Sequence, residues 1–299
     1  MLRLVAIAAI LLPGTAISDN GELLPGYLIQ VPTSIATILV AEAETSTLHR
    51  YGNGENGLDG HDTSYMSVGQ NGVGKLKAWD RRTPLGIYFV TDRLDTTGLH
   101  ERYGPVAFPL DYPNVWDRNS ERSGDGIWIH GVISNSERRP PRDTDGCIAL
   151  PNDELLRLES LLKPTVTPVI IARQIEWANS ADIDALRAEL IATLEAWASS
   201  YRSGDLHRYL SLYADDFEFL DMDKSEWAAY RLQAIALRPV DDYQISEVLL
   251  LSDPEEDGLY LSRFMQTITN DGRSIVTTKR LYWKRSDEGV LRIVAEDNG

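Results

Sequence analysis

The hydrophobic pattern changes near residue 178, and this change divides the chain into two parts with different architectures. Before it, short apolar runs are separated by Gly, Pro, Asn and Asp, which is typical of β-strands joined by turns. After it come amphipathic helices and then long alternating runs. A chain of 299 residues is long enough for two hydrophobic cores of ordinary size. We therefore expect two domains, at residues 23–175 and 180–299.

The first region is predicted to be mainly β. Strands are predicted at residues 27–31, 37–41, 65–68, 86–91, 126–129 and 167–172. The glycine-rich residues 52–57 are predicted to form a loop. Residues 152–162 alone carry leucines at a clear helical spacing in this half, and Pro164 would end that helix.

The second region is predicted to be an α+β domain. Residues 181–201 carry apolar side chains at spacings typical of an amphipathic helix, with Ser180 as the candidate cap and Gly204 beyond the end. Two further helices are predicted over residues 206–213 and 226–237. Antiparallel strands are predicted over residues 243–251, 259–270, 274–284 and 290–296. Helices followed by such a run of strands are typical of an α+β fold.

The N-terminus has the pattern of a secretory signal peptide. Arg3 precedes an apolar run over residues 4–12, and small residues follow around Ala16 and Ser18. We expect residues 1–18 to be removed and the mature chain to be exported. Because no later run approaches the roughly 20 apolar residues of a membrane helix, the mature chain is not expected to span a membrane. The net charge of −16 argues against nucleic acid and anionic membranes as partners.

Cys147 is the only cysteine of the chain. A lone thiol has no disulfide partner within its own chain, and in an oxidising compartment it risks mispairing. We therefore interpret Cys147 as a nucleophile, with a buried structural cysteine as the alternative. A thiol nucleophile needs a neighbour that takes its proton, because a free thiol near pKa 8.5 is mostly protonated at neutral pH.

His130 is the candidate base for this thiol. It follows the apolar residues 127–129, so we expect it at the end of a buried strand, where the Gly131 carbonyl could hold the imidazole. A histidine that only fills the core is the alternative. Gly146 allows close approach of the backbone just before Cys147, and amides of this loop could stabilise an oxyanion.

Three arginines, Arg138, Arg139 and Arg142, lie between the base and the nucleophile in sequence. They could bind a substrate carboxylate, because guanidinium groups pair with carboxylates through two parallel hydrogen bonds. A solvated charged loop explains them equally well.

Other chemistries find less support in the sequence. Residues 69–75 have the spacing of a phosphate-binding loop, but Leu76 stands where a hydroxyl would hold magnesium, so we interpret the glycines as a hairpin loop. The five histidines are scattered, which argues against a metal site. The Gly-x-Ser-x-Gly pattern of serine hydrolases is absent. We expect neither a metal nor another cofactor.

Four sequence blocks, in order, resemble the L,D-transpeptidase (YkuD-type) catalytic domain. They are residues 67–69 with 74–75, residues 80–88, residues 129–131 and residues 144–148. The resemblance covers roughly residues 25–174 and implies a β-rich periplasmic catalytic domain that acts on peptidoglycan stem peptides.

The resemblance also implies a mechanism and residue roles. The cysteine attacks the carbonyl at the L-centre of diaminopimelate, D-alanine leaves, and the thioester passes to an amine or to water. By position, Cys147 is the nucleophile and His130 the base. Gly131 supplies the carbonyl that orients this base, and Gly146 with Cys147 belongs to the oxyanion loop.

Two positions depart from that family's usual pattern. Thr144 stands where Ser is usual, and Ala149 stands where Arg is usual, which argues against ordinary crosslinking. We hypothesise that Arg139 or Arg142 replaces the missing guanidinium. Thr144 and Tyr112 complete the candidates for substrate contact. Residues 144–150, together with residues 103–105 and 112–114 upstream, look like a Gram-negative branch of the family that includes L,D-carboxypeptidases and an enzyme that detaches a murein-linked lipoprotein.

The second region resembles the NTF2-like fold, in which helices pack on a strongly curved sheet. The likeness rests on Trp197 and on residues 203–206, 213–217 and 282–284. Because that fold hosts both enzymes and binding modules, it implies no chemistry. We expect it to bind glycan, peptide or a partner, or to shape the cleft, with its aromatic residues in the core. A non-catalytic murein-binding scaffold is the alternative function for the whole chain.

Overall fold

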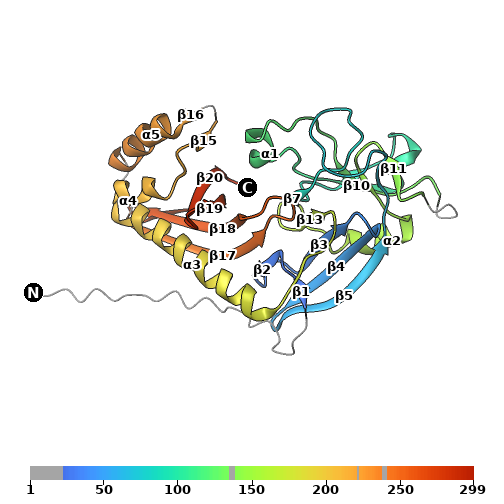
Figure 1. Cartoon of the computed structure of the whole chain (residues 1–299), viewed down its shortest axis with the longest axis horizontal. Helices are drawn as coiled ribbons and strands as arrows, with labels where there is room; N and C mark the ends of the chain where they lie inside the picture. Colours follow the sequence, from blue (N-terminus) through green and yellow to red (C-terminus); the bar gives the residue numbers. More distant parts are fainter. Residues whose placement is uncertain (1–22, 135–138, 221, 238–240) are drawn as a thin grey trace, which may run out of the picture.

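The computed structural model describes residues 23–134, 139–220, 222–237 and 241–299. The predicted signal peptide, residues 1–18, lies outside these residues, as does Arg138. Figure 1 shows two sheet-containing halves side by side, with the first region on one side and the long helix of the second region on the other. The predicted order of a mainly β domain and then an α+β domain is confirmed.

A five-stranded sheet forms the base of the first domain, in the order β5-β4-β3-β13-β7. Its strands are β3 (Thr37–Glu42), β4 (Thr47–Gly54), β5 (Gly57–Tyr65), β7 (Gly86–Phe89) and β13 (Pro168–Ala172). β3 and β13 run parallel, with Leu39 opposite Val169. Every residue of these two strands is buried, because both faces of the sheet are covered.

A second sheet of four strands packs on one face of the first, in the order β12-β10-β9-β8. Its strands are β8 (Leu94–Asp95), β9 (Val106–Pro109), β10 (Trp128–His130) and β12 (Ile148–Ala149). β10 and β12 run parallel, with Ile129 opposite Ile148. Because Cys147 comes directly before β12 and His130 ends β10, this pairing brings the two candidate catalytic residues to neighbouring strands.

Short elements complete the first domain. They are β6 (Val68–Gly69), β11 (Arg142–Thr144), α1 (Val115–Asn119) and α2 (Asn152–Glu159). β6 pairs in parallel with β11, and α2 follows β12. Tyr88, Phe108 and Ile129 lie in the hydrophobic core that the two sheets enclose with α2.

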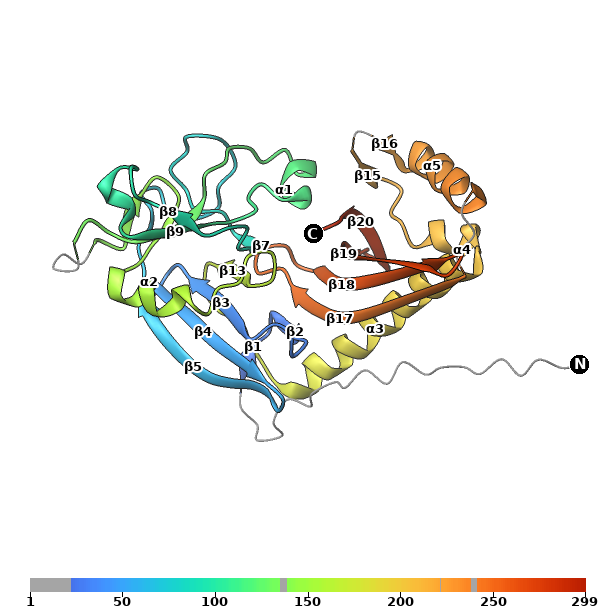
Figure 2. The ribbon, with the colours of Figure 1, turned by 180° about the vertical axis from the view of Figure 1, so that it is seen from behind.

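The second domain packs helices on a curved antiparallel sheet, visible from behind in Figure 2. The helices are α3 (Ser180–Ser203), α4 (Leu206–Ser211) and α5 (Lys224–Leu237), with the short strands β15 (Glu218–Phe219) and β16 (Met222–Asp223) before α5. The main strands are β17 (Asp242–Ser252), β18 (Leu259–Asn270), β19 (Arg273–Arg285) and β20 (Leu291–Asp297). Asn179, not the predicted Ser180, caps α3, because its side chain accepts a hydrogen bond from Asp182 N at 3.0 Å.

The N-terminal segment crosses from the first domain to the second. β2 (Leu28–Gln30) pairs with β17, so the second sheet has the order β2-β17-β18-β19-β20. β1 (Leu24–Pro25) pairs with β14 (Trp177–Ala178) between the domains. Ile38 and Ile170 of the first sheet share one hydrophobic core with Leu261 of the second. The two domains are therefore packed face to face over an apolar interface.

Two local predictions differ from the structure, and elements such as β5 and α1 were not predicted. Residues 52–57 are mostly the ends of β4 and β5, which pair as a hairpin. The sequence did not indicate β5 because this polar edge strand lacks alternation. Helix α1 was not predicted because five residues give no periodicity. Residues 69–75 are not a hairpin, because Gly69 belongs to β6 and Val73 forms a parallel bridge with Thr83.

Candidate active site

His130 is a buried histidine at the end of β10. Its side chain has Nδ1 2.7 Å from the carbonyl oxygen of Gly131, so the proton on Nδ1 is donated to that carbonyl and Nε2 is left as the basic nitrogen. Burial lowers the pKa of His130 from 6.5 to about 4, although the Gly131 hydrogen bond acts in the opposite direction. The imidazole is therefore neutral at pH 7.

The backbone after His130 is fixed by close packing around Gly131. The Gly131 amide donates to Tyr103 O at 3.0 Å. Asn152 at the start of α2 accepts from Val132 N at 2.7 Å and donates to Val132 O at 2.9 Å. A Cβ on Gly131 would lie 2.2 Å from Asn152 Oδ1, so no larger residue fits. This packing holds the carbonyl that orients the imidazole.

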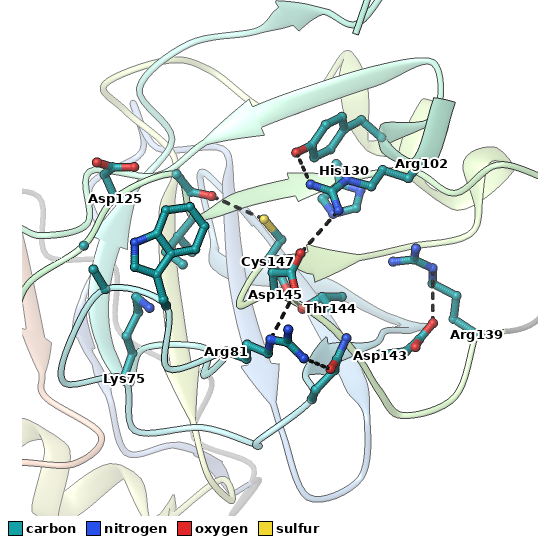
Figure 3. Close-up of a pocket in the computed structure, with 17 residues that line it drawn as sticks. Lys75, Arg81, Arg102, Asp125, His130, Arg139, Asp143, Thr144, Asp145 and Cys147 are labelled. Carbon is teal, nitrogen blue, oxygen red and sulfur yellow. Dashed lines mark hydrogen bonds and ion pairs between the residues drawn. The ribbon is translucent and has the colours of Figure 1, made fainter. Parts of the chain in front are cut away.

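Cys147 is half-buried and lines the same cleft as His130 (Figure 3). Its thiol donates to the Gly126 carbonyl oxygen at 3.3 Å. Burial raises the pKa of Cys147 to about 11. The resting site therefore holds a neutral thiol and a neutral imidazole, and the thiol must lose its proton during the reaction.

The turn before Cys147 is organised by Thr144. The Thr144 hydroxyl donates to Cys147 O at 2.7 Å and accepts from Gly146 N at 3.1 Å. Gly146 has φ +131°, and a Cβ there would lie 2.8 Å from Arg82 O. Only glycine satisfies both requirements at this position. The Gly146 amide is thus engaged within the turn that presents the thiol.

A cleft of about 660 Å³ opens in front of the thiol. Lys75, Arg81, Arg102 and Arg139 supply its cationic lining. Arg102 donates from Nη2 to Tyr103 Oη at 2.9 Å and pairs through Nη1 with Asp145 Oδ2 at 3.3 Å (Figure 3). The Tyr103 ring in turn meets the His130 ring edge to face at 5.2 Å. Arg102 therefore connects the candidate base to the loop that carries the cysteine.

The cleft contains some of the predicted substrate-binding residues and leaves out others. Arg139 and Thr144 line it, whereas Arg142 is exposed on β11 and does not. Tyr112 is buried in the core, where its hydroxyl donates to Ser123 O at 3.1 Å, so the fold gives it a packing role. Ala149, which stands where the family usually has arginine, is buried opposite His130 in β12.

Sequence reasoning missed several cleft residues, among them Trp79, Arg81 and Arg102. Arg81 and Trp79 sit in or beside the block that carried the family resemblance, and Arg102 precedes Tyr103. The signal was a cluster of basic and aromatic residues in a polar loop. That pattern is common on solvated surfaces, so it could not indicate a cleft without the fold.

The second domain has its own smaller cavity, of about 140 Å³, between α3, α5 and the sheet. Trp197 and Tyr209 lie in the core, as predicted for the aromatic residues of this domain, and they also line the cavity. The Arg231 guanidinium lies over the rings of Tyr201 and Trp227 at 4.9 and 5.2 Å. The cavity is thus aromatic with a cation at its wall.

Comparison with known proteins assigns both domains. Residues 36–171 match the L,D-transpeptidase catalytic domain (YkuD), and residues 189–297 match the Cds6 C-terminal NTF2-like domain. The first domain is thus an L,D-transpeptidase catalytic domain and the second is NTF2-like, as the sequence resemblance implied. No curated protein matches the chain in sequence.

Two solved structures share this two-domain fold. Bdellovibrio bacteriovorus Bd1075 aligns with a TM-score of 0.77 and 21% identity, covering 93% of this chain and 98% of its own. The helical cell shape determining protein Pgp2 from Campylobacter jejuni aligns with a TM-score of 0.73 and 24% identity, covering 88% and 91%. At such identities the likeness establishes the fold.

None of the helices in the described part of the chain combines the length and hydrophobicity of a membrane span.

Proposed function

We propose that this protein is a periplasmic cysteine enzyme that acts on peptidoglycan stem peptides at the L-centre of diaminopimelate. One observation carries the proposal: within an L,D-transpeptidase catalytic domain, His130 is held through Nδ1 by the Gly131 carbonyl and lines the same cleft as Cys147. The predicted signal peptide supports export to the periplasm.

The first chemical step forms a thioester. His130 Nε2 takes the thiol proton as Cys147 Sγ attacks the carbonyl carbon of the diaminopimelate L-centre. Because both groups start neutral, the charge appears only as the attack proceeds, and Gly131 O stabilises the imidazolium through Nδ1–H. The tetrahedral intermediate then collapses, and the amine of D-alanine leaves with the proton that His130 returns.

The second step decides between hydrolysis and transfer. Water or an amine gives up a proton to His130 and attacks the thioester, and the thiolate of Cys147 leaves and is reprotonated. The cationic lining, with Arg102 and Arg139, supports binding of the carboxylates of a stem peptide. Loss of the usual arginine at Ala149 favours hydrolysis, which would make the protein an L,D-carboxypeptidase-like enzyme.

The biological role proposed here is remodelling of the cell wall that affects cell shape. The similarity to Pgp2, a protein that determines helical cell shape, supports this role. A murein-linked lipoprotein is a second candidate substrate, because the same acyl-enzyme would form at its linkage to diaminopimelate. A non-catalytic murein-binding scaffold is the alternative, and it predicts no role for the thiol.

Mass spectrometry of muropeptides and lipoprotein-linked murein tests the proposal. The mature protein and its Cys147→Ala variant are incubated with each substrate. Shortened or lipoprotein-free stem peptides that depend on Cys147 identify a hydrolase, and new crosslinks or exchanged terminal residues identify a transpeptidase. No change with either protein, while both bind murein, would favour the scaffold.

A further inference from the structure

Trp79 lies at the cleft with its side chain almost fully in solvent. It is 95% exposed, yet it lines the cavity that contains Cys147. A tryptophan ring carries more apolar surface than any other side chain, and exposing it is unfavourable. A tryptophan this exposed in the lining of a cleft that contains a reactive thiol therefore suggests a surface that a ligand covers.

The backbone conformation that places Trp79 in this position is strained. Its φ of +65° lies in the left-handed region, which bulky residues seldom occupy and which persists only where surrounding contacts enforce it. Such strain is concentrated at functional sites. Relaxation of the turn would move the ring from the cleft, so the strain and the exposure of the ring are linked.

Asp80 supplies the contacts that enforce the turn. Its carboxylate accepts from Lys75 Nζ at 2.8 Å and from the amides of Leu76 and Arg82 at 2.9 and 3.0 Å. Burial acts to raise the pKa of Asp80, but these donors together outweigh it and lower the pKa to about 2, so the carboxylate stays ionised. The loop that presents Trp79 is thus fixed before any substrate arrives.

The chemistry of the cleft selects among possible ligands for this ring. The face of an aromatic ring carries partial negative charge and attracts cations or polarised C–H groups. The charges that line the cleft nearly balance, because Asp125, Asp143 and Asp145 line it together with Lys75, Arg81, Arg102 and Arg139, so the cleft as a whole does not select a cationic ligand. A pyranose ring presents a face of C–H bonds without a charge, and it matches an exposed indole.

We propose that Trp79 is a sugar-binding platform that stacks on a pyranose ring of the glycan strand while the attached stem peptide enters the cleft. This inference rests on the proposed function, because it takes the substrate to be peptidoglycan. Diaminopimelate, whose L-centre carries the reacting carbonyl, is the third residue of the stem, and three extended residues span about 10 Å. The glycan therefore lies at the rim of the cleft when the reacting carbonyl is at the thiol.

The test compares a disaccharide-tetrapeptide with the same tetrapeptide without sugar. Trp79→Ala is expected to lower kcat/KM about tenfold on the first substrate and to leave the second within about twofold, while Trp79→Tyr keeps most of the activity. Trp177→Ala is the matched control, because Trp177 is 48% exposed but does not line the cleft. Equal losses on both substrates, or no loss on either, would overturn the platform.

Binding measurements separate this inference from the proposed function. In a Cys147→Ala background, calorimetry compares the affinity of both ligands with and without Trp79→Ala. A weakening of about tenfold confined to the disaccharide-tetrapeptide supports the platform even if the wild-type protein turns over neither ligand. If the wild-type protein turns over the free tetrapeptide but Trp79→Ala leaves the affinity for the disaccharide-tetrapeptide unchanged, the proposed enzymatic function is supported and the sugar-binding role of Trp79 is refuted.

Discussion

Arg122 of the catalytic domain donates from Nη2 to Glu256 Oε1 of the NTF2-like domain at 3.1 Å, and from Nη1 to the buried Asp117 Oδ1 at 3.2 Å. The next residue, Ser123, donates its amide to Leu76 O at 3.1 Å, in the loop that lines the cleft. The second domain therefore contacts the chain that forms one wall of the active site.

Replacing Arg122 should destabilise the protein more than replacing a similar interdomain arginine. Arg122→Ala leaves Asp117, which is 1% exposed, without its cationic partner, and we expect a loss of about 3 kcal/mol in the free energy of unfolding. Arg173→Ala is the control, because Arg173 and its partner Glu255 are both more exposed, and its loss should stay below about 1 kcal/mol. Urea unfolding at pH 7 measures both, and equal losses would contradict the ranking.

The reactivity of Cys147 should rise steadily with pH. Because burial raises the pKa of the thiol to about 11, its rate of alkylation by iodoacetamide is expected to increase about tenfold per pH unit between pH 7 and 10. A plateau of fast alkylation at neutral pH would instead indicate a preformed thiolate–imidazolium pair. The Cys147→Ala variant gives the background rate.

Activity should persist well below the usual pKa of histidine. His130 acts as base when neutral, and its pKa is lowered to about 4, so kcat/KM should lose its base near pH 4 rather than pH 6.5. The unfolded chain binds more protons than the folded chain between these values. The stability contribution of the neutral His130 is therefore fully present above pH 6.5 and declines as pH falls toward 4. An acid limb of kcat/KM near pH 6.5 would argue against this environment.

Gly146→Ala should reduce activity through a steric clash as well as through the unfavourable positive φ. Both Gly146 and Gly204 have positive φ, but only at Gly146 would the new Cβ meet a backbone oxygen at 2.8 Å. We expect kcat to fall about 100-fold for Gly146→Ala, because the turn that presents the thiol must move. Gly204→Ala, with open space around its Cβ, should keep wild-type kcat while lowering stability by about 1 kcal/mol. Similar kcat for the two variants would refute the steric explanation.

Thr144→Val should impair the enzyme while Thr144→Ser should not. Valine keeps the shape of threonine but removes the hydroxyl that donates to Cys147 O and accepts from Gly146 N. We expect Thr144→Val to lower kcat/KM by about tenfold or more, since one buried and one partly buried hydrogen bond at the turn are lost. Serine retains the hydroxyl, so near wild-type kinetics are expected. Equal effects of the two variants would show that packing by the methyl group matters more.

The sequence was most predictive where chemistry and periodicity coincide. The predicted strand over residues 259–270 has the bounds of β18, because its alternation is long. Sequence reasoning selected Cys147 and His130 from the lone thiol and the apolar run before the histidine, and the parallel pairing of β10 with β12 explains how distant segments bring them together.

Other features depend on contacts that one segment cannot encode. Arg142 is closer to Cys147 in sequence than Arg102 is, yet Arg102 lines the cleft and Arg142 does not. Tyr112 belongs to a motif beside the catalytic blocks, but its ring faces the core and meets Tyr88 edge to face. Proximity in sequence therefore selected two side chains that line the cleft, Arg139 and Thr144, and two that do not, because the direction of a side chain is set by packing across sheets.

The pairing of β2 with β17 limits how freely the two halves can be recombined. The NTF2-like sheet takes its edge strand, Leu28–Gln30, from a segment that precedes the whole catalytic domain. A fragment that starts at residue 180 would leave the backbone of Leu250 and Leu251 as a bare, apolar edge open to pairing with other chains. The accessory domain is thus not a portable module, and a functional graft onto another enzyme would have to carry this leading strand with it.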